Sequence, residues 1–149
     1  MKILKDIKKG ATKEDNRNLV RWCVKYGIRP KVFFQVGLPG ETPETVEELR
    51  QEIVYLAALG LKDFDCSITT PYEGTPIYEH PEQHDIQFDK DELDFSKKVV
   101  LYKGIPGEYQ SFVSHARLTR DDLVAARQMI EDEGRKAIGL EPLLAKDDG

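Results

Sequence analysis

Cysteine and long apolar runs are both scarce in this chain. Only two cysteines, Cys23 and Cys66, occur among 149 residues, too few for a disulfide framework. Neither has a partner at the short spacing of a metal-ligand motif, so we interpret both as small apolar core residues. No apolar run approaches the roughly 20 residues that span a bilayer, and the first ten residues lack the apolar stretch of a signal peptide. These absences predict a cytoplasmic location without a membrane partner.

An excess of positive charge is also lacking. The chain has 22 Lys and Arg against 27 Asp and Glu, a net charge of −5, which argues against a broad nucleic-acid-binding face. The contents of 40% hydrophobic and 33% charged residues are typical of an ordinary globular domain. No Ser–His–Asp spacing, Walker loop or dinucleotide fingerprint is present.

The order of the predicted elements points to an α/β fold. The run 32–36 is short, β-branched and aromatic, which predicts a buried strand. A strand–helix–strand unit is right-handed, and its two strands run parallel. The loops that follow the two strands therefore emerge at one end, where α/β folds place ligands. We predict helices at 12–26, 42–60 and 119–139, with strands at 32–36 and 64–70.

The two loops after the predicted strands have related sequences. In the first, GLPGET, Gly37 and Gly40 permit backbone conformations that other residues disfavour, and Pro39 stiffens the turn. Thr42 caps a helix whose free N–H groups carry partial positive charge, within reach of the Glu41 carboxylate or of a ligand. The second loop, TTPYEGTP at 69–76, repeats the pattern. One such loop is explained as a strand-to-helix connection, but two that meet at one end favour a ligand site.

GLPGET, the helix after it, and a strand that ends in TPYEGTPIYE together resemble the second half of radical S-adenosylmethionine (SAM) enzymes. The likeness covers about residues 4–79, including LKDIKKGATKEDN and YGI. It implies a fragment of a partial (β/α)6 TIM-like barrel that contains its last strands and helices. More loosely, LDFSKKVVLYKG and LTRDDL resemble the tails of radical SAM proteins with a cobalamin-binding domain. The implied units are a half-barrel fragment (1–79), an irregular substrate-side or covering segment (80–118), a C-terminal helix (119–140) and an acidic tail (141–149).

The resemblance also implies which residues contact the cofactor. The first loop would lie beside the adenine of SAM, and the end of the second strand would contact the adenine through its backbone. Gln35 and Tyr72 are substrate-side candidates. For Gln35 the favoured role is a hydrogen bond to neighbouring backbone, whereas a plug of the barrel mouth explains Tyr72 as well as a substrate contact does. The implied cofactor-binding residues are Gly37, Leu38, Pro39, Gly40, Glu41, Ile68, Thr69, Thr70 and Pro71.

The chain departs from the radical SAM pattern because the Cys-x-x-x-Cys-x-x-Cys motif is absent. The resemblance therefore implies the C-terminal part of an iron–sulfur oxidoreductase or transferase. The parent would cleave SAM reductively at a [4Fe–4S] cluster to a 5′-deoxyadenosyl radical that abstracts hydrogen from an unknown substrate. The chain alone would be inactive, without catalytic or metal-binding residues of its own. Its expected partner is the N-terminal half of the barrel. Because half a barrel has two open strand edges and an uncovered interior, the isolated chain would self-associate.

The alternative function is a non-catalytic α/β domain that binds a nucleotide-like ligand or a protein partner. Other candidate residues carry less information. His80 and His84 are four apart, but Pro81 and polar neighbours favour an exposed loop over a metal pair. His115 has no evident partner, and Trp22 is expected in the core or an interface. Charge alone makes Arg117 and Arg120 candidates for binding a substrate carboxylate.

Overall fold

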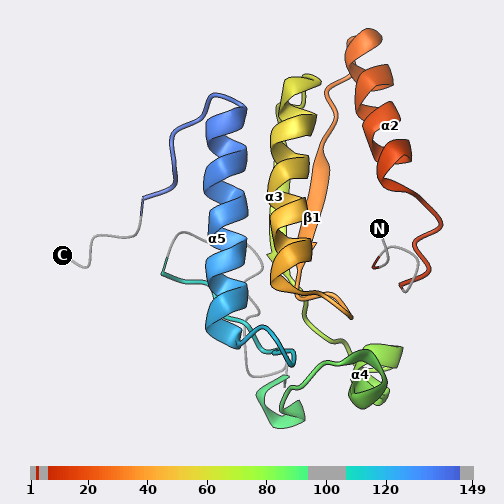
Figure 1. The fold of residues 1–149 in the computed structure, drawn as a ribbon, viewed down its shortest axis with the longest axis vertical. Coiled ribbons are helices and arrows are strands. Elements are labelled where there is room, and N and C mark those ends of the chain that lie inside the picture. Colours follow the sequence, from red (N-terminus) through yellow and green to blue (C-terminus); the bar gives the residue numbers. More distant parts are fainter. Residues whose placement is uncertain (1–2, 4–6, 94–106, 145–149) are drawn as a thin grey trace.

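The computed structural model describes Ile3, residues 7–93 and residues 107–144 of the chain. The longer elements alternate between helix and strand, as the sequence predicts (Figure 1). The cobalamin-type resemblance depends partly on residues 94–104, which lie outside the described residues. The elements are α2 (Lys13–Lys25), β1 (Val32–Val36), α3 (Pro43–Ala58), β2 (Phe64–Ile68), α4 (Pro76–Glu79), two short 3-10 helices (Pro81–His84 and Lys90–Leu93) and α5 (Arg120–Ala137).

The two strands form a parallel sheet with α3 as the crossover between them, so this prediction is confirmed. Val32 pairs with Phe64, and the register continues without a break to Val36 and Ile68. The Val32 amide donates to the carbonyl of Asp63 at 3.2 Å, and the Thr69 amide donates to the carbonyl of Val36 at 2.8 Å. Parallel pairing therefore carries the chain from both strands to the same end of the sheet.

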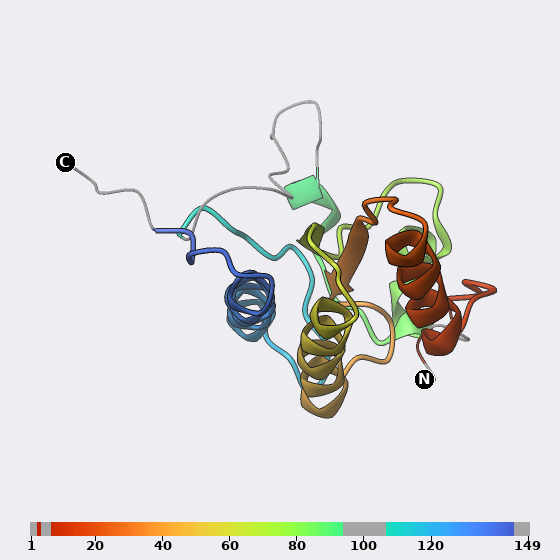
Figure 2. The ribbon, with the colours of Figure 1, turned by 90° about the horizontal axis from the view of Figure 1, so that it is seen from above.

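One face of the sheet is buried and the other is not, so the prediction of a buried strand at 32–36 is only half right. Phe34 and Val36 point into the core, whereas Phe33 is 74% exposed. Seen from above, α5, α3 and α2 lie in an arc around the buried face (Figure 2). The core residues of α3, α5 and the two strands form one cluster with Val20, Leu61, Ile86, Val113 and Leu118.

Threonine caps fix where the long helices begin. Thr12 and Asp15 form a reciprocal capping box at the start of α2. Thr119 and Asp122 form a second at the start of α5. Thr42 does the same for α3, with Pro43 in the first turn, where its missing N–H costs nothing. The predicted helix starts are thus confirmed by the local hydrogen bonds that a cap requires.

The α5 helix packs closely on the sheet because its Gly134 has no side chain. A Cβ at this position would lie 2.5 Å from the Cζ of Phe64 and 2.9 Å from the Cγ1 of Ile53. Leu123, Ala126 and Ile130 are buried as predicted, but Ala137 is exposed. The apolar stripe of α5 therefore ends at the glycine contact, before the last turn of the helix.

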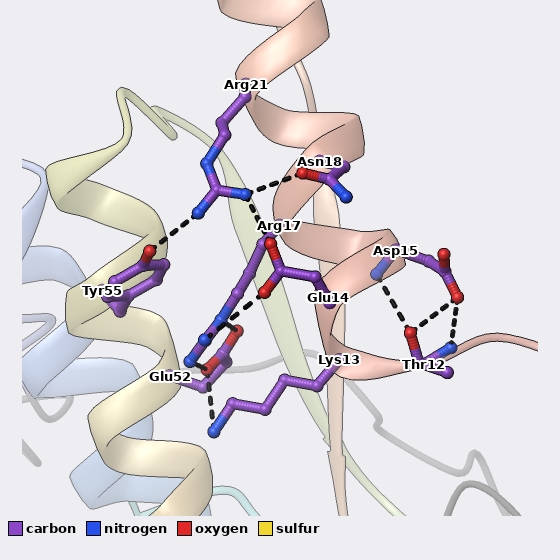
Figure 3. Close-up of polar contacts among 9 residues, drawn as sticks. All are labelled: Thr12, Lys13, Glu14, Asp15, Arg17, Asn18, Arg21, Glu52 and Tyr55. Carbon is purple, nitrogen blue, oxygen red and sulfur yellow. Dashed lines mark hydrogen bonds and ion pairs between the residues drawn. The ribbon is translucent and has the colours of Figure 1, made fainter.

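Polar contacts hold α2 against α3 (Figure 3). Arg17 donates to both carboxylate oxygens of the buried Glu52, at 2.9 and 2.6 Å. Lys13 approaches the same carboxylate at 3.0 Å. The Arg17 guanidinium also stacks on the ring of Tyr55, 4.1 Å from its centroid, and Arg21 donates to the Tyr55 hydroxyl at 2.8 Å. These polar contacts act beside the apolar contact of Val20, which is fully buried in the core cluster.

The described residues place four more of the side chains that the sequence singles out. Trp22 is 61% exposed, so it is not a core residue. His115 is buried and has a partner, since its Nδ1 lies 2.8 Å from the carbonyl oxygen of Asp85. Arg117 pairs with Glu44 and Arg120 pairs with Glu92, each at 2.8 Å. None of the helices in the described part combines the length and apolar character of a bilayer-spanning segment.

We expect Gly134→Ala to destabilise the fold. Alanine normally stabilises a helix interior by about 1 kcal/mol relative to glycine. Here the added methyl group meets the Phe64 ring, and overpacking of this kind costs about 1–3 kcal/mol. Urea unfolding should give a net loss of up to about 2 kcal/mol for Gly134→Ala, and a smaller loss for the same substitution in a Phe64→Leu background. A stabilised Gly134→Ala variant would contradict the close contact.

We expect Glu52→Ala to loosen α2 from α3. The substitution leaves Arg17 and Lys13 without their shared acceptor, and loss of one partner from a largely buried pair costs about 2 kcal/mol or more. Hydrogen exchange should accelerate throughout α2. Glu47→Ala is the matched control on the same helix. It removes a surface pair with Arg50 and an exposed hydrogen bond from Gln51 and should cost less than about 1 kcal/mol. Equal effects of the two substitutions would show that Glu52 does not hold α2.

Candidate functional site

The loops after β1 and β2 are joined by hydrogen bonds at the carboxyl end of the sheet. The Thr69 hydroxyl donates to the carbonyl of Val36 at 3.0 Å, in addition to the bond from its amide. Gln35 donates from Nε2 to the Thr69 hydroxyl at 3.1 Å. Gln35 thus bonds a side chain of the neighbouring loop, not the backbone that the sequence suggests. The result is a fixed spacing between the two loops.

Gly37 starts the first loop in a conformation that favours glycine, with φ of 81°. A Cβ at this position would lie 3.4 Å from both Leu123 of α5 and Val113, and 3.5 Å from Thr69. A larger side chain would push these neighbours apart as well as strain the backbone. The turn therefore lies packed against α5 on one side and against the second loop on another.

Glu41 is almost completely buried, with 1% of its surface exposed. Its Oε2 accepts a hydrogen bond from the amide of Gly37, which closes the GLPGE turn on itself. Burial raises the pKa of the Glu41 carboxyl to about 7, although the amides of Gly37 and Leu38 oppose this shift. Its Oε1 is buried without a hydrogen-bond partner among the described residues. One carboxylate oxygen of Glu41 therefore holds the turn together, and the other is an acceptor without a hydrogen bond from the described residues.

The second loop is held by its own residues. The Thr75 hydroxyl donates to the carbonyl of Tyr72 at 2.6 Å and caps α4 through the amide of Tyr78. The Gly74 amide donates to the carboxylate of Glu79 at 3.1 Å. Tyr72 itself is 56% exposed. The cap and the short helix α4 fix the direction in which the chain leaves β2.

The candidate residues gather at one end of the sheet but differ in access to solvent. The residues that shape the two turns are buried, and those beside them are half-buried or exposed. A ligand at this end would touch the second group directly and depend on the first for its shape. The buried residues are Gly37, Pro39, Glu41, Thr69 and Pro71; Leu38, Ile68 and Thr70 are half-buried; Gln35, Gly40 and Tyr72 are exposed.

A cleft of about 160 Å³ lies beside β1, between α3 and the start of α2. Local sequence gives no signal for it, because its walls come from segments far apart in the chain. Glu41 and Leu38 reach it from the GLPGE turn, so the cleft adjoins the predicted site. The remaining walls are Ile3, Ile7, Lys9, Lys13, Asn16, Val32, Phe33, Phe34, Gln35, Leu49, Glu52 and Leu56.

Comparison with known proteins finds a similarity that covers part of the chain. The chain is 33% identical over 79 residues to an uncharacterized methyltransferase of Pyrococcus horikoshii. The match covers 53% of this chain but 17% of that protein. The matched part of the chain therefore corresponds to about one sixth of the length of the relative. No protein-family model and no solved structure matches the chain.

The residues of this chain do not fit an iron–sulfur cluster, which is held by several cysteine thiolates. The sequence contains two cysteines. Cys66 is 1% exposed, and burial raises the pKa of its thiol to about 12. Cys23 is half-buried. Among the described residues no group of three or more His, Cys, Asp or Glu side chains is placed to hold a metal ion.

We expect Glu41 to make the stability of the fold depend on pH. Its pKa is about 7 in the folded protein against an ordinary value of 4.5. The folded state therefore binds the proton more tightly than the unfolded state. The contribution is fully present below pH 4.5 and is lost as the pH rises through 7. The loss amounts to at most about 3 kcal/mol.

Glu41→Gln is the variant that isolates this effect, because glutamine keeps an acceptor for the Gly37 amide and does not titrate. Urea unfolding of both proteins between pH 4.5 and pH 8 should show the wild type losing stability relative to the variant. The groups that titrate in both proteins cancel in this difference. A difference that stays constant with pH would mean that the Glu41 carboxyl is not desolvated.

Proposed function

We propose that this chain is part of a methyltransferase-like enzyme that uses S-adenosylmethionine, and that it supplies the surface facing the adenine. The observation that carries the proposal is the convergence of two loops at one end of a parallel strand pair. Support comes from the 79-residue similarity to an uncharacterized methyltransferase. The carboxyl end of parallel strands is where α/β enzymes bind their ligands.

The proposed adenine contacts divide into two groups by burial. Leu38, Gly40, Ile68 and Thr70 have accessible surface and would touch the ring or its edge through backbone groups. The buried residues Gly37, Pro39, Glu41, Thr69 and Pro71 would keep the two loops at the right separation. SAM itself supplies the reactive sulfonium, so the role of these residues is to bind the nucleoside, orient it and exclude water from one side.

Gln35 and Tyr72 are proposed to face the substrate. Both side chains are exposed, and each comes from a different one of the two loop-bearing segments. Gln35 is already oriented by its bond to the Thr69 hydroxyl. A polar group that is fixed before the substrate arrives loses little conformational entropy on binding.

The finer proposal is that the parent protein is a radical SAM enzyme and that this chain forms the trailing strands and helices of its barrel. The sequence resemblance supports it, together with the arc of helices around one face of the sheet (Figure 2). The cluster ligands would then lie in other parts of the parent, since this chain does not fit a cluster. The isolated chain is accordingly proposed to bind the adenine side of SAM without catalysing a reaction.

A non-catalytic domain that binds a nucleotide-like ligand is the second candidate. The chemistry of the site favours this candidate. Glu41 is the acid of the site whose pKa is raised, but its carboxylate accepts a hydrogen bond from the Gly37 amide of its own turn and so serves the turn rather than a reaction. The two functions differ in what they recognise. An enzyme of the first kind should prefer the adenosyl group with its amino-acid arm, and the second kind should bind adenosine equally well.

We expect the amide resonances of residues 38, 40, 68 and 70 to shift when SAM is added to the labelled chain. Nuclear magnetic resonance titration with SAM, adenosine, cytidine and methionine separates recognition of the adenine from recognition of the amino-acid arm. Shifts that occur with cytidine as readily as with SAM, or that fall outside the two loops, would overturn the proposed site. Equal affinity for adenosine and SAM would favour the second candidate.

Gly40→Ala should weaken SAM binding about tenfold, because it adds a methyl group and strains a residue with φ of 74°. Gly139→Ala is the matched control. It strains a residue with φ of 80°, where a Cβ meets nothing within 4 Å, beyond the end of α5. Both variants should lose about 1 kcal/mol of stability, but only Gly40→Ala should lose affinity. Equal affinities would remove Gly40 from the site.

A further inference from the structure

The cleft beside β1 combines an apolar interior with a positively charged rim. Its apolar walls include Ile7 of the N-terminal segment, Phe34 of β1, and Leu49 and Leu56 of α3. An apolar cavity of about 150 Å³ can hold a benzene ring, and this cleft has a volume of about 160 Å³. Its interior therefore suits one aromatic ring or a branched alkyl group of similar size.

Positive charge exceeds negative charge at the rim of the cleft, which Lys9 and Lys13 both line. The Nζ of Lys13 lies 3.0 Å from Oε2 of Glu52, but Arg17 already donates to both oxygens of that carboxylate (Figure 3). Lys9 is exposed and forms no ion pair with another described residue. One lysine therefore shares its acceptor and the other has none, although the chain as a whole has a net charge of −5.

The other groups near the cleft do not cancel this excess. Glu41 is a second acid in the wall, and burial raises the pKa of its carboxyl to about 7, so at pH 6 it is mostly uncharged. Glu14 lies outside the wall and pairs with Arg21 at 2.7 Å and Arg17 at 3.7 Å. Asn16 lines the cleft and carries an amide that can donate to an anion. An apolar interior with a cationic rim matches a ligand that joins a carboxylate to an apolar body.

A lysine beside an apolar surface is often explained without a ligand, because its stem packs on the surface while its ammonium group stays in water. The ammonium group of Lys13 is instead fixed beside the buried carboxylate of Glu52. A cation that is already oriented loses little conformational entropy when it binds an anion, and partial burial strengthens the attraction between them. The arrangement therefore favours a binding site over an ordinary solvated rim.

We propose that the cleft binds a small carboxylate, with an apolar body the size of a phenyl ring packed between β1 and α3 and the anionic group paired with Lys9 and Lys13. This site is separate from the proposed adenine contacts at the ends of the two strands, and it does not rest on the SAM proposal. Leu38 belongs to both, because it lines the cleft and lies in the GLPGE turn. A ligand in the cleft therefore lies next to the adenine site without occupying it.

Phenylacetate and phenylacetamide test the proposal, because they have the same ring and nearly the same shape but differ in charge. In a nuclear magnetic resonance titration of the chain at pH 6, both should shift the methyl resonances of Ile7, Leu49 and Leu56. Phenylacetate should bind about tenfold more tightly, because a charge-assisted hydrogen bond is stronger than a neutral one. The oppositely charged 2-phenylethylamine should bind more weakly than either.

The double variant Lys9→Gln, Lys13→Gln should bind phenylacetate and phenylacetamide equally. The double variant Lys25→Gln, Lys62→Gln is the matched control, because it removes the same charge at the end of α2 and before β2 and should keep the preference. All four lysines are exposed or half-buried, so both variants should fold. A preference that survives in the first variant would remove Lys9 and Lys13 from the site.

Leu49→Trp tests the position of the apolar body. The larger side chain should fill the cleft and abolish binding of phenylacetate. Val54→Trp is its control, because Val54 lies on the same helix but is 40% exposed and is not part of the cleft wall. Circular dichroism should show both variants folded. Unchanged phenylacetate binding by Leu49→Trp would place the ligand outside the cleft.

Three outcomes with the unchanged chain would also overturn the proposal. Phenylacetate that causes no shifts, or that binds no more tightly than phenylacetamide, would mean that the cleft has no carboxylate site. Tighter binding of 2-phenylethylamine would mean that Glu41 and Glu52 determine which charge the cleft accepts. Methyl shifts that grow with protein concentration without any probe would make a second copy the occupant. The amides of residues 40, 68 and 70 report SAM binding separately, so failure of one proposal leaves the other standing.

Discussion

The burial of one face of a two-stranded parallel sheet is the constraint on which the remaining structure depends. Two parallel strands cannot be joined by a tight turn, so a crossover helix is obligatory, and α3 supplies it. The face that α3 and α5 cover gathers Phe34, Val36 and Cys66 into one core. Both strands then end at the same place, which brings the GLPGE turn beside Thr69. The candidate site is thus a geometric consequence of how the core is buried.

The site is rigid because its buried polar groups must form hydrogen bonds within the protein. A buried carboxyl is costly unless its oxygens accept hydrogen bonds, and Glu41 meets that requirement on one oxygen by bonding the amide of Gly37. The buried hydroxyl of Thr69 also needs a hydrogen-bond partner, and it donates to the carbonyl of Val36. The first bond closes the GLPGE turn and the second joins the two loops, so the polar groups that need partners also fix the positions of the accessible residues Gly40 and Thr70.

Sequence alone predicts those features whose causes are local. The capping threonines, the proline after Thr42 and the alternation of strand and helix all act within a few residues, and the structure confirms the elements that they predict. The exposure of Phe33, the polar α2–α3 interface through Glu52, and the contact of Gly134 with Phe64 depend on residues far apart in the chain. Spacing within one segment carries no information about them. The same holds for the cleft beside the predicted site.

The asymmetry between the two sheet edges bears on how such a chain avoids aggregation. An uncovered strand edge invites pairing with other chains, and Arg127 reduces that hazard at β2 by occupying the carbonyl of Cys66. A buried guanidinium is expensive to desolvate, and its stacking on Tyr109 and pairing with Glu131 offset part of that cost. No comparable group covers β1 among the described residues. Among the described residues, one edge of the sheet therefore meets a buried charge and the other borders an apolar cleft.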